Sequence, residues 1–112
     1  MNVQIYGSKK SFDTKKAERY FKERKIPYQY IDVHEFGMSK SIFDAVKRCM
    51  DVEELIDRKA KAYKDLYMDY IDEKKREGTL FENPTLFQTP IVRNGKTQFT
   101  LGYCPDVWKD WE

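Results

Sequence analysis

The chain has 112 residues, the length of one compact domain, and its 21 basic and 19 acidic residues leave a formal net charge of +2. This near-balance excludes the strong cationic field of a dedicated nucleic-acid-binding or anionic-membrane-binding protein. Charged residues make up 36% of the chain and the mean hydropathy is −0.83. An aromatic content of 15% nevertheless supplies large side chains for a core, so the composition predicts a folded, soluble domain.

The first ten residues lack the apolar segment of a secretory signal peptide, and no stretch approaches the ~18 apolar residues that a membrane-spanning helix needs. The two cysteines, Cys49 and Cys104, are too few for a disulfide framework. They form no Cys-x-x-Cys pair, and the single histidine, His34, stands apart from both, so no metal site is predicted. We expect a cytoplasmic protein with reduced thiols and no membrane association.

The N-terminal third predicts a strand, a helix and a second strand. Residues 3–6 alternate in polarity and predict the first strand. A helix follows from Ser11 or Asp13, because a polar cap precedes apolar residues spaced three and four apart. Residues 28–32 predict the second strand. With short connections this is a right-handed βαβ unit, so the two strands should be parallel neighbours.

Residues 39–82 carry helical periodicity throughout and predict a helical insert. One apolar stripe places Cys49 with Phe43, Val46 and Met50, which predicts a buried structural thiol.

The second half of the insert is more polar. It contains three tyrosines at helical spacing: Tyr63, Tyr67 and Tyr70. We interpret them as core or half-buried surface rather than as a platform for stacking bases. Residues 72–77 are expected to form a solvated helix face that ends at Gly78, with a further short turn beginning at Leu80. His34, which precedes the insert, is expected in a solvated loop.

The end of the chain returns to sheet. Asn94-Gly95 between apolar runs is the strongest short hairpin signal, and Pro105 suits the first position of a terminal helix. The elements together predict an α/β fold with a four-stranded mixed sheet in the order 2-1-3-4. The helical insert, at about 39–82, lies between strands two and three, and residues 1–112 form a single domain.

Three segments resemble the arsenate reductase (ArsC) family, which also contains the Spx transcription regulators. The first spans 5–17 and reads IYGSKKSFDTKKA, similar to the family's strand, Tyr-Gly turn, cysteine, basic pair and alanine. The second spans 83–92 and reads NPTLFQTPIV, similar to the family's segment around an Arg-Pro-Ile. The third, 101–103, matches the Gly-aromatic end of the last strand. The resemblance covers essentially the whole chain and implies a thioredoxin-like fold.

The chain departs from the family where the resemblance implies chemistry. Ser11 stands at the position of the nucleophilic cysteine, and Thr14 at that of the resolving cysteine which some members carry. Thr89 replaces the arginine before the signature proline, which is credited with holding the oxyanion. A further arginine of the family falls on Arg58 or Lys59.

The replacement at Ser11 changes what this helix start can do. A helix N-terminus lowers the pKa of a thiol into the neutral range, whereas a serine hydroxyl stays protonated and needs a general base. Serine forms no S–S or S–As bond, so redox chemistry at this position is excluded while residue 11 is serine. Helix capping is the first interpretation. A second keeps an anion pocket, lined by Ser8, Lys9, Lys10, Ser11 and Thr14. A third is an engineered cysteine-to-serine change at Ser11.

The C-terminal part also resembles the glutaredoxin tail, which grips glutathione. That resemblance places Asp106 where an acid takes the amino group of glutathione. The thioredoxin-like fold implied by the ArsC resemblance in turn implies a cis Thr89-Pro90 peptide bond, and the alternative is an ordinary trans proline at a strand start. Cys104 precedes a predicted helix and is the candidate thiol. The helix start lowers its pKa and Asp106 raises it, so we expect a pKa near the ordinary ~8.5 and a reachable sulfur. The alternative is a helix cap without chemistry.

Three functions remain open. They differ in whether the chain is an enzyme, which the sequence leaves undecided. The first is a non-catalytic or regulatory thioredoxin-fold protein that binds a protein partner, for example RNA polymerase if the chain is Spx-like. The second is a glutathione-linked arsenate or thiol reductase that works through Cys104 or through a native cysteine at position 11. The third is an anion- or glutathione-binding module without turnover. The first is favoured because the nucleophile, the resolving thiol and the arginine are missing together. No bound cofactor and no direct nucleic-acid contact are predicted.

Overall fold

The computed structural model describes residues 1–112, and the chain divides into two compact units. One unit consists of 1–32 and 89–112, and the other of 33–88. The prediction of a single domain with a helical insert at about 39–82 stays a prediction. None of the helices combines the length and the apolar character needed to cross a bilayer.

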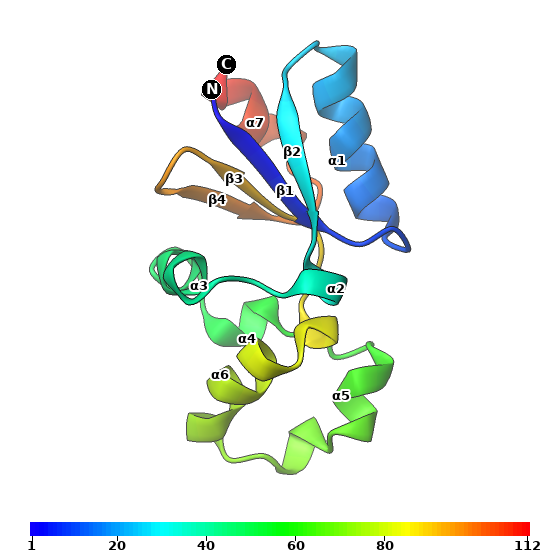
Figure 1. Cartoon of the computed structure of the whole chain (residues 1–112), viewed down its shortest axis with the longest axis vertical. Coiled ribbons are helices and arrows are strands. Elements are labelled where there is room, and N and C mark those ends of the chain that lie inside the picture. The colour runs from blue at the N-terminus through cyan, green and yellow to red at the C-terminus, as the bar shows by residue number, and fades with distance from the viewer. The chain divides into compact units, whose positions relative to one another are not determined.

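The first unit contains the predicted four-stranded sheet (Figure 1). Its strands are β1 (Val3–Gly7), β2 (Tyr28–Asp32), β3 (Ile91–Asn94) and β4 (Gln98–Leu101). Their order is β2-β1-β3-β4. β1 runs parallel to β2, and the other two pairs are antiparallel. The hairpin turns at Gly95, whose φ of 64° suits a residue without a Cβ. The predicted order, directions and hairpin are all confirmed.

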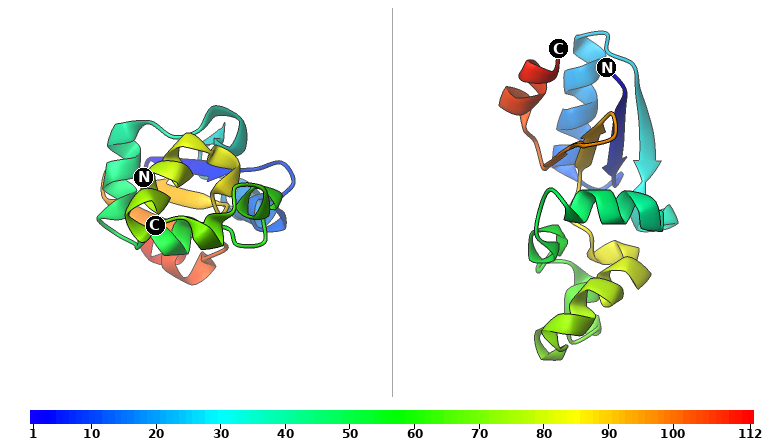
Figure 2. Two further views of the ribbon diagram at one scale, coloured as in Figure 1. Left: turned by 90° about the horizontal axis from the view of Figure 1, so that it is seen from below. Right: turned by 90° about the vertical axis from the view of Figure 1, so that its left-hand side faces the viewer.

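One face of this sheet carries the core of the first unit. Alternate residues of β1, Val3 and Ile5, pack against α1 (Phe12–Glu23) and α7 (Pro105–Trp111). The right-hand view of Figure 2 shows these two helices beside the sheet. Trp108 is completely buried there, and its indole N–H donates to the Thr100 hydroxyl at 2.8 Å. Pro105 opens α7 as predicted, because a first-turn residue needs no N–H.

The second unit is a set of short helices. They are α2 (Val33–Phe36), α3 (Lys40–Lys47), α4 (Val52–Leu55), α5 (Lys61–Asp65), α6 (Glu73–Glu82), and the 3₁₀ turns η1 (Met68–Tyr70) and η2 (Pro84–Leu86). Ser39 caps α3 by accepting a hydrogen bond from the Ile42 N–H at 3.3 Å. The core contains Phe43, Val46 and Leu80 among its fully or almost fully buried residues. The insert is thus helical as predicted, but in several pieces.

Four local predictions in this unit are wrong, in addition to the one for 72–77 described below. Helix α6 continues through Gly78 and includes Leu80, because burial of Leu80 holds the last turn together despite the weak helix preference of glycine. It ends at Asn83, before Pro84, since a residue before proline is kept out of the helical region. Cys49 is exposed, because α3 stops two residues earlier at Lys47.

The remaining two concern His34 and the tyrosines. His34 is half-buried in α2 rather than in a solvated loop. Of the three tyrosines only Tyr63 is buried, while Tyr67 and Tyr70 are exposed. The chain bends at Tyr67, where the backbone takes a left-handed φ of 53°, so the helical period that predicted a continuous stripe is broken there.

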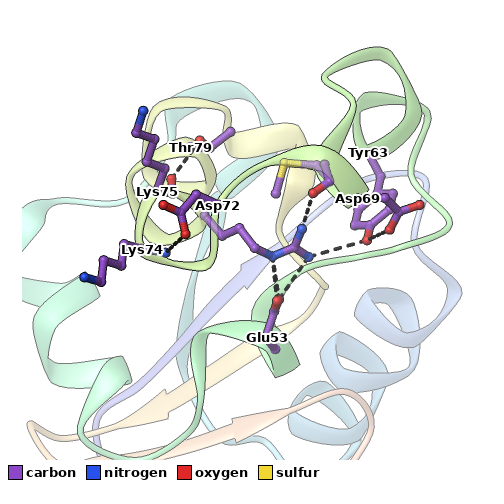
Figure 3. Close-up of polar contacts among 9 residues, drawn as sticks. Glu53, Tyr63, Asp69, Asp72, Lys74, Lys75 and Thr79 are labelled. Atoms are coloured by element: carbon purple, nitrogen blue, oxygen red, sulfur yellow. Dashed lines mark hydrogen bonds and ion pairs between the residues drawn. The ribbon is translucent and has the colours of Figure 1, made fainter.

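The segment 72–77, predicted as a solvated face, contains a buried arginine. Figure 3 shows the polar contacts of this region, with Glu53, Tyr63 and Asp69 labelled. Arg76 is 8% exposed, and its guanidinium binds both carboxylate oxygens of Glu53, with Nε at 2.6 Å from Oε1 and the terminal nitrogen at 3.1 Å from Oε2. It also donates to the Met68 carbonyl oxygen and, at 3.4 Å, to the Tyr63 hydroxyl. The Tyr63 hydroxyl in turn donates to Asp69 at 2.5 Å. One guanidinium therefore joins α4, α5, η1 and α6.

Substitution of Arg76 tests this role. Because Glu53 is 45% exposed and regains water, Arg76→Met should lower the free energy of unfolding by about 2 kcal/mol, mainly through the lost bonds to the Met68 carbonyl and to Glu53. Arg76→Lys should also destabilise, since an ammonium cannot make the paired contact. Lys74→Met, on the exposed side of the same helix, is the control and should change stability by less than about 0.5 kcal/mol. Urea unfolding followed by circular dichroism measures all three, and equal effects of Arg76→Met and Lys74→Met would contradict the assignment.

Candidate functional site

The site predicted from the sequence lies where β1 leads into α1. Ser11 is the N-cap of α1, with extended backbone (φ −87°, ψ 121°) and its hydroxyl oxygen accepting from the Thr14 N–H at 3.2 Å. The turn before it is closed by the Ser11 N–H, which donates to the Ser8 carbonyl at 3.1 Å, and by the Lys10 N–H, which donates to the Ser8 hydroxyl at 3.3 Å. The capping interpretation of Ser11 is confirmed.

The end of β1 approaches the first turn of α1 very closely. Thr14 is 1% exposed, and its hydroxyl accepts from the Ser8 N–H at 3.3 Å. A Cβ on Gly7 would lie 2.4 Å from Thr14 Cγ2 and 2.8 Å from Thr14 Oγ1, so only glycine fits. Gly7 is a structural residue that the sequence analysis did not single out. Its signal was a glycine at the end of the first strand, four residues before the helix cap.

The cap is also joined to the segment that precedes β3. The Ser11 hydroxyl donates to the Thr89 carbonyl oxygen at 3.4 Å, and the Thr89–Pro90 peptide bond is cis, as the resemblance implied. The Pro90 carbonyl accepts from the Gly102 N–H at 2.8 Å, which ties this segment to the end of β4. The structure thus brings Ser8, Ser11, Thr14 and Thr89 together, although Thr89 is far from the others in sequence.

The surroundings of the cap are positively charged. Four exposed lysines flank it: Lys9, Lys10, Lys15 and Lys16. Two of them lie over rings, with Lys15 Nζ 5.8 Å from the centre of Phe12 and Lys16 Nζ 5.7 Å from that of Tyr103. First-turn amides of a helix have no partner within the helix, so N–H donors and positive charge coincide here.

Neither partner of the Ser11 hydroxyl activates it as a nucleophile. One partner is an N–H, and the other is a carbonyl oxygen, which cannot take the proton at neutral pH. His34, the only histidine, has its Nε2 at 2.9 Å from the Phe87 carbonyl oxygen. Since a carbonyl only accepts, Nε2 is the donor in this contact. Ser11 caps α1, and neither of the two hydrogen-bond partners of its hydroxyl is a base.

Cys104 is the N-cap residue of α7 and is half-buried. Its Sγ donates to the Leu101 carbonyl at 3.2 Å. Burial, assisted by the negative charge of Asp13, raises the pKa of the thiol above its ordinary value. The expectation of an unshifted pKa is therefore wrong. The acid that acts on the sulfur is Asp13, its neighbour in space, and not Asp106, which is exposed in the first turn of α7.

The other predicted positions lie elsewhere. Arg58 and Lys59 are exposed residues of the helical unit, between α4 and α5. No group of three or more histidine, cysteine, aspartate or glutamate side chains is arranged to hold a metal ion.

The fold and this helix start define a class. A βαβ unit followed by an antiparallel hairpin, with a cis proline beside the start of the first helix, is a thioredoxin-like architecture. The sequence model of the ArsC family matches residues 6–111, and the chain belongs to the ArsC family.

Solved structures agree with this fold. An arsenate reductase from Vibrio cholerae has a TM-score of 0.78 and 22% identity over 98% of this chain and 97% of its own. A putative ArsC family related protein from Bacteroides fragilis has a TM-score of 0.80 and 16% identity over 100% and 98%. A putative arsenate reductase from Yersinia pestis has a TM-score of 0.80 and 19% identity over 96% and 98%. No curated protein matches the sequence significantly.

The close approach of Gly7 and Thr14 predicts the effect of a single methyl group. Gly7→Ala should lower the free energy of unfolding by roughly 1–3 kcal/mol, because the buried, hydrogen-bonded Thr14 cannot move away freely. Gly78→Ala is the matched control: nothing lies within 4 Å of its Cβ, so it should stabilise α6 by roughly 0.5–1 kcal/mol. Adding Thr14→Ser, which removes Cγ2 and keeps the hydroxyl, should recover part of the loss. Equal melting temperatures for Gly7→Ala and Gly78→Ala would rule out the steric argument.

The two cysteines should react in the opposite order to that expected from the sequence. Cys49 is exposed and should label with a thiol reagent in the native protein. Cys104 should label more slowly, because a raised pKa leaves less thiolate at any given pH, and its rate should keep rising above about pH 9. The single variants Cys49→Ser and Cys104→Ser assign the two rates. Fast labelling of Cys104 at about pH 6 would contradict the raised pKa.

Proposed function

We propose that this ArsC-family chain is a non-catalytic, regulatory member that acts by binding a protein partner. The observation that supports the proposal is the hydrogen bonding of Ser11. At the family's nucleophile position stands a hydroxyl whose proton is directed to the Thr89 carbonyl and whose oxygen caps α1. The group has a structural task and no base to activate it.

The neighbouring positions point the same way. Thr14, at the resolving position, is buried and holds the turn through the Ser8 N–H. Thr89, at the position of the oxyanion-holding arginine, brings no positive charge. An engineered cysteine-to-serine change would explain Ser11 but neither Thr14 nor Thr89. The natural gene sequence at codon 11 tests that alternative directly.

The reductase alternative finds less support. Cys104 is the one cysteine of the first unit. Its pKa is raised, and its Sγ donates a hydrogen bond to the Leu101 carbonyl. A helix start ringed by lysines does favour the third candidate, the binding of a small anion or glutathione without turnover, and such binding is compatible with a regulatory role.

The partner class follows from the charge. A formal net charge of +2 suits protein binding better than nucleic-acid binding. An Spx-like role would make RNA polymerase the partner, and the exposed helices of the 33–88 unit would supply the contact surface.

The proposal predicts no turnover. Purified protein should reduce neither arsenate nor a disulfide substrate with glutathione, glutaredoxin or thioredoxin as electron donor. Ser11→Cys should create a thiol that labels at about pH 6, because the helix start lowers its pKa, yet arsenate should still not be reduced, since Thr89 supplies no guanidinium. Bacterial RNA polymerase on a biosensor tests the partner directly. Lys96→Ser, in the hairpin turn between β3 and β4, should bind it as the wild type does, because the proposed contact surface belongs to the 33–88 unit. Wild-type turnover that survives Cys104→Ser would refute the non-catalytic role.

A further inference from the structure

A groove of about 460 Å³ lies on the helical unit, next to the turn at Tyr67. Aromatic and apolar side chains form one part of its lining, and charged side chains form the other. The first group is Tyr63, Tyr67, Met68 and Tyr70, and the second is Arg58, Lys64 and Asp69. It belongs entirely to the 33–88 unit, and the candidate site at Ser11 does not include it.

Two of its aromatic side chains are exposed and do not belong to the hydrophobic core. Tyr67 is 70% exposed and Tyr70 is 87% exposed. Tyr67 also has a left-handed φ of 53°, a conformation that costs a non-glycine residue energy and persists only where its surroundings impose it. Exposed tyrosines at the edge of a groove are typical of protein contact surfaces, where tyrosine and arginine carry much of the binding energy.

The floor of the groove is held firmly (Figure 3). Tyr63 donates to Asp69 at 2.5 Å, and Arg76 donates to the Met68 carbonyl while it holds Glu53 through two bonds. Because Tyr63 and Met68 are buried and bonded, the groove is formed before any partner arrives, which lowers the entropy cost of binding.

Two cations and one anion line the groove: Arg58, Lys64 and Asp69. Four exposed basic residues occur within seven positions: Arg58, Lys59, Lys61 and Lys64. None of them forms one of the ion pairs of the structure, whereas Arg76 and Lys47 do. Asp69 accepts from the Tyr63 hydroxyl and keeps its negative charge, so the lining carries two positive charges against one negative charge. An acidic partner would find complementary charge here.

We infer that this groove binds an acidic peptide segment of a protein partner, with an apolar or aromatic side chain placed between Tyr67 and Tyr70 and carboxylates facing Arg58 and Lys64. The inference rests on the proposed partner-binding function and assigns the chemistry of the partner. A peptide fits better than single-stranded nucleic acid, because two cations line the groove beside Asp69, too few for a track along successive phosphates.

The test uses three fluorescein-labelled peptides of about twelve residues and the full-length protein. The first peptide carries acidic residues around a central Trp-Leu pair, the second has lysine in place of each acid, and the third has serine in place of Trp-Leu. Fluorescence polarisation should show binding of the first and at least about tenfold weaker binding of the other two. An oligothymidine strand and sedimentation velocity of the protein alone are run beside them.

Variants locate the surface. Tyr67→Ser combined with Tyr70→Ser, and separately Arg58→Glu combined with Lys64→Glu, should each weaken binding of the first peptide about tenfold or more. Matched controls are Phe36→Ser, an equally exposed aromatic at 75%, and Arg19→Glu combined with Lys22→Glu on α1. These controls should leave binding within about twofold, and circular dichroism verifies that all variants are folded.

The inference is overturned if the first peptide does not bind, if the groove variants bind it as the controls do, if oligothymidine binds more tightly, or if the tyrosines instead mediate self-association. Each of these results, obtained with a protein that shows no reductase activity, leaves the non-catalytic proposal standing. Reductase activity in the same preparation overturns that proposal independently of the peptide result.

Discussion

The pairing of β1 on both of its edges is the constraint on which the first unit depends. Each residue from Val3 to Tyr6 has a partner on β2 and another on β3, so one five-residue strand joins a parallel and an antiparallel ladder. The same strand presents Val3 and Ile5 to Phe21 and Trp108, so register and core are set together. Where β1 ends, at Gly7, the route of the chain into α1 passes close to the side chain of Thr14.

That route places the residues at the start of α1 in contact with one another. The Ser11 hydroxyl accepts from the Thr14 N–H, and the Thr14 hydroxyl accepts from the Ser8 N–H. The Ser11 hydroxyl also donates to the Thr89 carbonyl oxygen. Hydroxyl groups serve these contacts well because each donates and accepts. The start of α1 is therefore held together by neutral hydroxyl groups and backbone, and a fold by itself does not define a chemistry.

The basic side chains of the helical unit fall into two groups, buried and exposed. Arg76 is buried and fully used, and it organises the junction of four short helical segments. Arg58 and Lys64 are exposed and lie beside aromatic rings that the fold does not use. Burial requires a charge to be paired and hydrogen-bonded, so Arg76 is tied to structure, whereas the exposed pair is free to meet a ligand.

The sequence by itself determined the strand order, the directions of the strands, the hairpin at Gly95 and the cap at Ser11. These depend on local rules: alternation, the handedness of a βαβ connection, turn chemistry and the preference of serine for helix starts. The resemblance to the ArsC family added the cis bond before Pro90.

The tertiary structure alone decided which side chains are buried where the helices are short. Periodicity predicted that Cys49 is buried and that Arg76 is exposed, and the structure reverses both. Cys49 is exposed because the eight-residue helix α3 ends before its apolar pattern does. Arg76 is buried because Glu53 and Met68, from distant positions in the sequence, accept its hydrogen bonds. The same applies to Cys104, whose pKa is governed by burial and by Asp13 rather than by its sequence neighbour Asp106. Burial and charge act through space, and their partners are chosen by the fold, which is why no local pattern along the chain reveals them.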